Sequence, residues 1–198
     1  YSRTKRSQRD NSAAVYLNDR WSLSPQWTLT GGLRATRDDY LKETVLDPRL
    51  GLEYSYSPQT VFFVGAGRHH QEPSRDQSLS EIGNPYLKSI RSKQVVFGVK
   101  QNLEQGWSWR AELYKKEFDH FVVSDPIQNY RNGASGSAQG LEVLVKKEMG
   151  NGLSGFVSLS VSKSKRHNDL TGENFIFGYD QPVIANAVLQ YKESEKLQ

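Results

Sequence analysis

The hydrophobic and polar residues of this chain alternate with a period of two over most of its length. In residues 27–36, Trp27, Leu29 and Leu33 share one face, and the positions between them hold Thr, Gly or Arg. The same alternation recurs in the segments 49–56, 107–114, 140–146, 154–162 and 183–192. Because successive side chains of a β-strand point to opposite faces, the pattern predicts strands that each have one apolar face.

The predicted connections alternate in length. Short turns are expected at 24–26, 57–59, 104–106, 150–152 and 193–195, and longer polar stretches lie near 37–47, 69–92, 119–137 and 163–181. In an up-and-down antiparallel meander, this places the short turns at one end of the sheet and the long loops at the other. We expect about nine strands of roughly ten to thirteen residues, with a tenth beginning at Lys196.

Two architectures accommodate such strands. In a soluble sandwich or a lipocalin-like barrel the apolar face fills a core, whereas in an outer-membrane barrel it faces lipid and the polar face lines the lumen. The strand lengths favour the membrane barrel, because a tilted strand needs about 9–11 residues to cross. Mixed charges suited to a watery lumen occupy the polar face: Arg34, Arg49, Glu53, Arg110, Glu112, Glu142 and Lys146. Aromatic residues gather near the short turns, as in an interfacial girdle: Trp21, Trp27, Tyr54, Tyr56, Trp107 and Trp109.

Composition and charge argue against several classes of partner and site. Of the 198 residues, 36% are hydrophobic and 24% are charged, and the net charge of +4 comes from interleaved acids and bases. The basic start at 3–9 is short and acids soon follow it, which argues against nucleic-acid binding. There is no cysteine and hence no disulfide or thiolate metal site. Because the first residue is Tyr1, we expect a mature, trimmed or partial chain.

Several ordered motifs resemble one family. "AVYLNDRWSLSPQWTLTGGLR" (14–34) is similar to the Y-x-x-D-x-W…W-x-L-x-x-G-L-R hairpin of TonB-dependent outer-membrane receptors. "LDPRLGLEYSYSPQTVFFVGAGRHHQEPS" (46–74) and "GNPYLKSIRSKQVVFGVK" (83–100) resemble the segments that follow it in that family. "AELYKKEFDHFVV", "GSAQGLEVLVKK" and "DQPVIANAVLQY" resemble its later strands. The resemblance covers nearly the whole chain in order.

The resemblance implies an all-β fold, an antiparallel up-and-down transmembrane β-barrel. Such receptors have a barrel of about 22 strands, a plug domain and a TonB box. The chain has room for about nine or ten strands, shows no plug-like segment and ends at Lys196-Leu197-Gln198 without a terminal aromatic residue. We therefore expect residues 1–198 to be part of the receptor's barrel domain, a fragment that lacks the plug and the remaining strands.

The same resemblance implies uptake of a bulky nutrient across the outer membrane. The expected ligand is a ferric siderophore, cobalamin or a glycan, bound at the external loops and the upper lumen. The expected partners are the TonB–ExbB–ExbD system, acting through a plug outside this chain, and outer-membrane lipid with lipopolysaccharide. No cofactor, nucleic acid or catalytic activity is expected.

Candidate ligand contacts lie where strands meet external loops. His69 and His70 are adjacent on a predicted strand and should point to opposite faces, which argues against a shared metal ion. In the stretch 124–136, an aromatic residue beside Arg and Asn fits a polar ligand as well as it fits a solvated turn. Basic residues of the predicted loop 163–181 fit either an anionic ferric chelate or lipopolysaccharide phosphates. The resulting set of candidates is His69, His70, Gln71, Tyr130, Arg131, Asn132, Arg166 and Tyr179.

The evidence for catalysis is thin. "GASGS" (133–137) lacks the strand-to-helix turn of a nucleophile elbow, and "GAGRHH" (65–70) has no helix to receive a phosphate. Two alternatives to the receptor stay open at the level of sequence. One is a soluble β-sandwich or lectin-like binding domain, and the other is an outer-membrane enzyme or adhesin on a smaller barrel.

Overall fold

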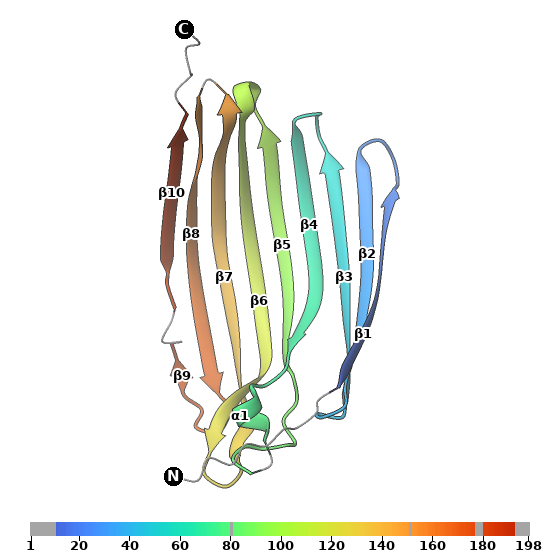
Figure 1. The fold of residues 1–198 in the computed structure, drawn as a ribbon, viewed down its shortest axis with the longest axis vertical. Helices are drawn as coiled ribbons and strands as arrows, with labels where there is room; N and C mark the ends of the chain where they lie inside the picture. The colour runs from blue at the N-terminus through green and yellow to red at the C-terminus, as the bar shows by residue number, and fades with distance from the viewer. Residues whose placement is uncertain (1–10, 80, 151, 177–179, 193–198) are drawn as a thin grey trace.

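A single antiparallel sheet makes up most of the molecule (Figure 1). The computed structural model describes residues 11–79, 81–150, 152–176 and 180–192. Its elements are β1 (Ser12–Ser22), β2 (Trp27–Asp38), β3 (Glu43–Ser55), β4 (Thr60–Gln71), α1 (Arg75–Ser78), β5 (Ile90–Asn102), the 3-10 helix η1 (Glu104–Gly106), β6 (Trp107–Asp125), β7 (Asn129–Gly150), β8 (Leu153–Asn168), β9 (Asn174–Phe175) and β10 (Val183–Tyr191). The strands follow the order β1-β2-β3-β4-β5-β6-β7-β8-β10, with β9 paired to β8. The all-β up-and-down prediction is confirmed.

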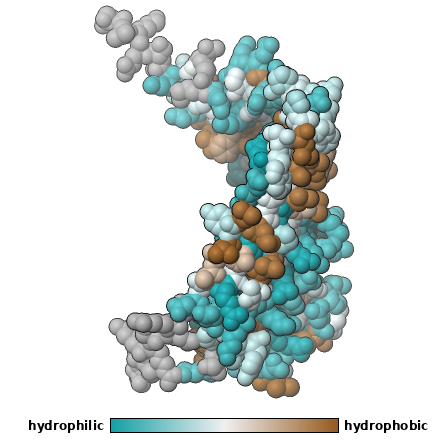
Figure 2. Space-filling model, turned by 90° about the vertical axis from the view of Figure 1, so that its right-hand side faces the viewer, coloured by the Kyte–Doolittle hydropathy of each residue, from teal (hydrophilic) through white to brown (hydrophobic). Residues whose placement is uncertain are grey.

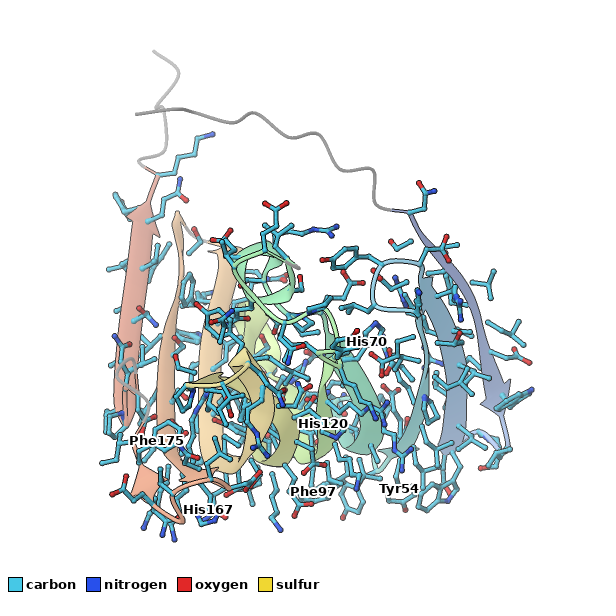
Figure 3. All side chains as sticks on the ribbon, turned by 90° about the horizontal axis from the view of Figure 1, so that it is seen from below. Tyr54, His70, Phe97, His120, His167 and Phe175 are labelled. Atoms are coloured by element: carbon cyan, nitrogen blue, oxygen red, sulfur yellow. The ribbon has the colours of Figure 1, made fainter. Side chains whose placement is uncertain are left out.

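The sheet is an open arc. Within the described residues, β1 pairs only with β2, and β10 pairs only with β8. Seen along the strands, α1 lies on the concave side, and Tyr54 and Phe97 lie on the convex side (Figure 3). The short turns gather at one end, the turn end, and α1 and the longer connections gather at the other, the loop end (Figure 1).

The convex face is apolar across its whole width. Cross-strand pairing produces one continuous row from β1 to β10: Trp21, Leu29, Leu52, Val64, Phe97, Leu113, Leu141, Val161 and Val183. Nothing covers this row, since Phe97 is 50% exposed and Leu113 57% exposed. Seen from the β1 side, the molecule is hollowed on one side, and hydrophobic residues gather along part of the opposite edge (Figure 2).

Little of the chain is buried in a core of its own. Among the described residues, the buried apolar side chains are Val45, Leu87 and Ala134. A soluble sandwich would bury its apolar face against a second layer, and a single curved sheet has no such layer. The sequence pattern thus encodes a surface for an apolar solvent, which is how a membrane-spanning sheet is built.

Two turns at the turn end repeat one local solution. In Ser24-Pro25-Gln26, the Ser24 hydroxyl accepts hydrogen bonds from the amides of Gln26 and Trp27 at 3.2 and 3.1 Å. In residues 57–59, the Ser57 hydroxyl accepts hydrogen bonds from the amides of Gln59 and Thr60 at 3.2 and 3.0 Å. Proline sets φ for the bend, and the serine satisfies the exposed amides.

The loop end differs from expectation. Polar stretches near 37–47 and 119–137 were expected to be loops, yet β2 and β3 leave only residues 39–42 between them, and β6 and β7 leave only 126–128. The expected strand length is also wrong for three strands, since β6, β7 and β8 have 19, 22 and 16 residues. The alternation that reveals a strand is lost there, because β6 ends with the unbroken apolar run Phe121-Val122-Val123, whereas β7 begins and β8 ends with mainly polar residues. The strand expected at Lys196 lies outside the described residues.

Candidate ligand-binding site

The concave face carries a group of cations near the loop end. Register places Arg49, Gly67, Gln94 and Lys116 in one row across β3 to β6. Because Gly67 has no side chain, Arg49 and His69 both fold over it: a β-carbon at this glycine would lie 3.3 Å from Cγ of Arg49 and 3.5 Å from Nε2 of His69. We call Arg34, Arg49, His69, Gln94 and Lys116 the concave basic group.

Hydrogen bonds fix the middle of this group. Nη2 of Arg49 lies 3.4 Å from Nδ1 of His69, and the Gln94 amide lies 2.6 Å from Nε2 of the same ring. Because a guanidinium can only donate, Nδ1 of His69 accepts and the ring's proton sits on Nε2. His69 is therefore neutral in this arrangement, and the positive charge belongs to Arg34, Arg49 and Lys116. A hollow of about 200 Å³ adjoins the group beside Arg34 and Arg49.

Further toward the turn end, the concave charges neutralise one another. Glu53 lies 3.2 Å from Arg20 and 3.7 Å from Lys100. Arg110 forms an ion pair with Glu112, and its guanidinium stacks 4.8 Å from the centroid of the Phe63 ring. Register places the predicted lumen residues on this one face: Arg34, Arg49, Glu53, Arg110, Glu112, Glu142 and Lys146. Their exposure to a closed lumen stays a prediction.

Strict alternation would place His70 on the face of the sheet opposite His69, but the structure does not arrange the two side chains in that way. Its Nδ1 lies 2.6 Å from a carboxylate oxygen of Asp47, and Asp47 is almost fully buried. Pairing of β3 with β4 ends at Arg49 and Gly67, whereas β4 stays paired with β5 up to Gln71. The two strands therefore separate here, and both histidines contact β3. Close to this separation lies a hollow of about 520 Å³, lined in part by Asp47, His69 and His120.

The connection 72–89 is tied down at both ends rather than solvated. The Tyr40 hydroxyl donates to the carbonyl of Ser78 at 2.6 Å, and the amide of Ser89 donates to Glu43 at 2.9 Å. Asn84, which is nearly buried, donates through Nδ2 to the carbonyl of Tyr130 at 2.7 Å. The segment thus connects the β2–β3 turn to the β6–β7 hairpin on the concave side (Figure 3).

Asn132 adds a further link between the segment 72–89 and the β6–β7 hairpin, and we call its hydrogen bonds the clamp. Its Oδ1 accepts from the amide of Lys88 at 2.8 Å, and its Nδ2 donates to the carbonyls of Lys88 and His120 at 2.9 and 2.8 Å. The side chain expected to contact a ligand is thus engaged by the protein itself. Of its neighbours, Tyr130 is half-buried, and Arg131 pairs with Asp125 at 3.7 Å.

The remaining candidates lie apart from the concave basic group. Gln71 is exposed at the end of β4. Arg166 lies in β8 and not in a loop, and its guanidinium stacks 4.1 Å from the centroid of the Phe121 ring. Tyr179 lies outside the described residues.

Sequence reasoning missed His120. It sits at a β-bulge between Phe118 and Phe121, with a positive φ of 64°. Its buried Nδ1 has no hydrogen-bond partner among the described residues. Bulges re-aim side chains, and no sequence pattern marks this one.

The described residues contain no group of three or more His, Cys, Asp or Glu side chains arranged to hold a metal ion. No helix within them has the length and hydrophobicity to cross a membrane.

Comparisons with known proteins agree with this geometry. A family model described as "TonB dependent receptor-like, beta-barrel" matches residues 1–191. No curated protein sequence matches the chain.

Solved structures share the fold. The ferric enterobactin receptor PfeA of Pseudomonas aeruginosa is 17% identical with a TM-score of 0.77, over 93% of this chain and 31% of that one. The siderophore receptor PirA of the same organism is 20% identical with a TM-score of 0.68, over 78% and 32%. The FrpB iron transporter of Neisseria meningitidis is 17% identical with a TM-score of 0.61, over 80% and 26%. The chain matches about a third of the length of these structures or less.

Proposed function

Because the chain belongs to the TonB-dependent receptor-like β-barrel family, whose members are outer-membrane proteins, we propose that it forms a section of barrel wall in a receptor that imports a ferric siderophore. The section would contribute wall, lumen charges and loop-end contacts. Energy would come from the TonB–ExbB–ExbD system through a plug domain outside this stretch. Residues 1–198 would then be one part of the barrel domain.

The concave basic group is the observation that carries the choice of ligand. Arg34, Arg49 and Lys116 are cations on the concave wall, whereas the charges nearer the turn end are paired with acids. Even with Asp47 beside Arg34, the three cations leave this part of the wall positive, and a positive wall attracts an anionic ligand such as many ferric chelates. PirA and PfeA, which share this fold, are siderophore receptors and support the same ligand class. Cobalamin and neutral glycans would gain less from these charges.

The soluble lectin-like alternative is not favoured. It requires the apolar face to be covered, and the row that contains Phe97 and Leu113 is open on every strand of the arc. The family match also points to a transport receptor rather than an enzyme. Within the described residues, no cluster of nucleophile and base emerges at the concave basic group, where the hydrogen-bond partners of His69 are Arg49 and Gln94.

Uptake measurements on the complete receptor test the proposal. Cells that lack other iron receptors would be given labelled ferric enterobactin, a ferric hydroxamate, cyanocobalamin or a maltodextrin, with and without a protonophore. We expect energy-dependent uptake of a ferric chelate. The double variant Arg49→Gln with Lys116→Gln should weaken binding of the ferric chelate by roughly tenfold or more, because it removes two cations from a wall that is partly shielded from water. Lys42→Gln at the loop tip serves as the control.

Two outcomes would refute this function. Uptake of the maltodextrin or cyanocobalamin in place of every ferric chelate would exclude the siderophore. Unchanged chelate affinity in the double variant would remove the concave basic group from the binding site. Among the loop candidates, Tyr130 and Arg131 remain proposed contacts, and replacing both with Ala should also weaken binding.

A further inference from the structure

The strands β3 and β4 separate near the loop end and leave an opening in the wall. Their backbone ladder ends at Arg49 and Gly67, although β3 extends back to Glu43 and β4 extends on to Gln71. Pro48 stands at the point of separation and has no amide hydrogen to donate to a neighbouring strand. Its carbonyl lies on the β4 side, 3.4 Å from the position of a β-carbon at Gly67. Because the N–H and C=O of one strand residue point to the same neighbour, the missing donor also falls on the β4 side.

Two side-chain contacts span the separation in place of backbone hydrogen bonds. His70 and Arg91 are cross-strand partners on β4 and β5. His70 contacts Asp47 of β3 at 2.6 Å, and Arg91 contacts Glu43 of β3 at 2.8 Å. By strict alternation, the first two side chains start on the convex face and the two acids start on the concave face. Both contacts therefore cross from one face of the sheet to the other through the gap.

A hollow at this gap has walls from both faces of the sheet. Its volume of about 520 Å³ is within the ~300–1,000 Å³ of pockets that hold small ligands. Leu46 of the convex face lines it, as do Asp47 and His69 of the concave face. Its Arg, Lys and Asp side chains sum to no net charge: Arg68, Arg91, Lys93, Asp47, Asp119 and Asp169. The hollow itself thus does not select an anionic group. We call it the wall opening.

The wall opening connects the proposed ligand site to an apolar groove. On the concave side it includes Asp47, which also borders the 200 Å³ hollow, and His69 of the concave basic group. On the convex side it shares Arg68 and Lys93 with a groove of about 640 Å³. The floor of that groove includes exposed apolar side chains: Leu50, Ala66 and Val95. The basic group, the opening and the groove are therefore contiguous.

The wall opening lies at the upper limit of the apolar band. Arg68 and Lys93 are in register with Glu117, which lies ten residues along β6 from Trp107 at the turn end. Ten steps of ~3.4 Å on a strand tilted by ~40° rise ~26 Å, close to the ~25 Å height of the apolar band of such barrels. A molecule in the opening would thus have the lumen on its concave side and lipid acyl chains directly below its convex side.

We infer that the imported chelate is an amphiphile, whose ferric headgroup binds the concave basic group while its acyl tail passes through the wall opening into the convex groove. This inference rests on the proposed function, because it names the class of siderophore that the same site takes. A tail held in the lumen would expose each CH₂ to water, whereas a tail that reaches the groove stays in lipid. A hollow that leads from cations to an exposed apolar groove matches a ligand with an anionic head and an apolar tail.

Two synthetic ferric chelates with the same headgroup test the inference. Both are citrate-based dihydroxamates of equal negative charge, and one hydroxamate acyl group is either acetyl or dodecanoyl. Binding to the complete receptor in lipid nanodiscs would be measured with radioactive iron, and retention by empty nanodiscs would be subtracted. Leu46→Trp places a larger side chain in the opening and should weaken binding of the dodecanoyl chelate by roughly tenfold, with the acetyl chelate changed by less than about twofold. The matched control Leu17→Trp, on the convex face of β1, should bind both chelates as the parent does.

Photolabelling of the parent needs no variant, and heat-dependent gel mobility would show that each variant is folded. A diazirine at the end of the dodecanoyl tail should label the segments 46–50 and 93–97, and excess acetyl chelate should remove that label. Labelling that survives the acetyl chelate, or a folded Leu46→Trp variant that treats both chelates alike, would overturn the inference. Binding of the acetyl chelate alone, or of neither chelate, by the parent would also overturn it. The uptake measurements, which use other ferric chelates, decide separately whether the receptor imports a siderophore.

Discussion

Replacing Asn132 with Ala should release the segment 72–89 from the β6–β7 hairpin while leaving the sheet intact. The side chain makes three hydrogen bonds of 2.8 to 2.9 Å, two to the backbone of Lys88 and one to the carbonyl of His120. A net value of about 0.5–1 kcal/mol per bond applies because Lys88 is exposed and water can replace its lost partners. The free energy of opening this clamp should therefore fall by about 1.5–3 kcal/mol.

Hydrogen exchange measures this loss directly. A decrease of about 1.5–3 kcal/mol raises the exchange rate of the protected amides by roughly 10- to 150-fold. Mass spectrometry of the complete receptor in detergent would follow a peptide that covers 83–90, with a peptide from 93–101 in β5 as the internal reference. Gln128→Ala, which removes a single bond of 3.2 Å to Asn84, should change the rate by only about two- to fivefold.

Asn132→Asp separates the two halves of the interaction. The carboxylate keeps an acceptor for the amide of Lys88 but directs lone pairs at the carbonyls of Lys88 and His120. It should therefore open the clamp at least as far as Ala does. Unchanged exchange in 83–90 would refute the view that Asn132 helps to hold this segment, and loss of protection that extends to β5 would refute the view that its effect is local.

Two further predictions concern stability. A β-carbon at Gly98 would lie 2.2 Å from Cζ of Phe63, so Gly98→Ala should destabilise the fold by about 1–3 kcal/mol and lower the thermal midpoint in detergent. Gly51→Ala is the control and should be close to neutral, because the nearest atom to its β-carbon lies at 3.8 Å. Equal thermal midpoints for the two variants would contradict this packing. Partial desolvation and the neighbouring charge of Asp38 raise the pKa of Glu72 above its ordinary value, so the folded state holds this proton more tightly than the unfolded state does and stability falls as pH rises through the raised pKa. Glu72→Gln should remove that pH dependence from the protection of 72–89, after correction for intrinsic exchange, and a variant with the parent's pH profile would exclude Glu72 as its source.

The sequence predicted the strands wherever the two faces differ in polarity. Alternation in 27–36 and 107–114 placed Leu29 and Leu113 on the face that the structure leaves exposed. The signal fails at the loop end, where β6 has an unbroken apolar run and the facing part of β7 is mainly polar or small, so neither strand alternates. Their pairing there depends on backbone hydrogen bonds and a bulge at His120, neither of which leaves a mark on hydrophobic periodicity.

The site was predicted only in part for a related reason. Residue type indicated that Tyr130, Arg131 and Asn132 could contact a ligand. It did not indicate whether these side chains would instead be engaged in contacts within the protein. Asn132 is occupied by Lys88, a residue 44 positions away in the sequence. The concave basic group likewise arises from strand register, because Arg49 and Lys116 come into one row only when Gly67 and Gln94 lie between them.

The concave and convex faces of the sheet carry different groups of cations at the same height near the loop end. On the concave side, strands hold Arg49 and Lys116, so the proposed ligand would meet cations whose positions do not depend on the clamp around Asn132. On the convex side, the same height along β4 and β5 presents Arg68 and Lys93 to the membrane. Because successive residues alternate faces, the register that brings Arg49 and Lys116 into one row on the concave face also sets which of their neighbours lie on the convex face.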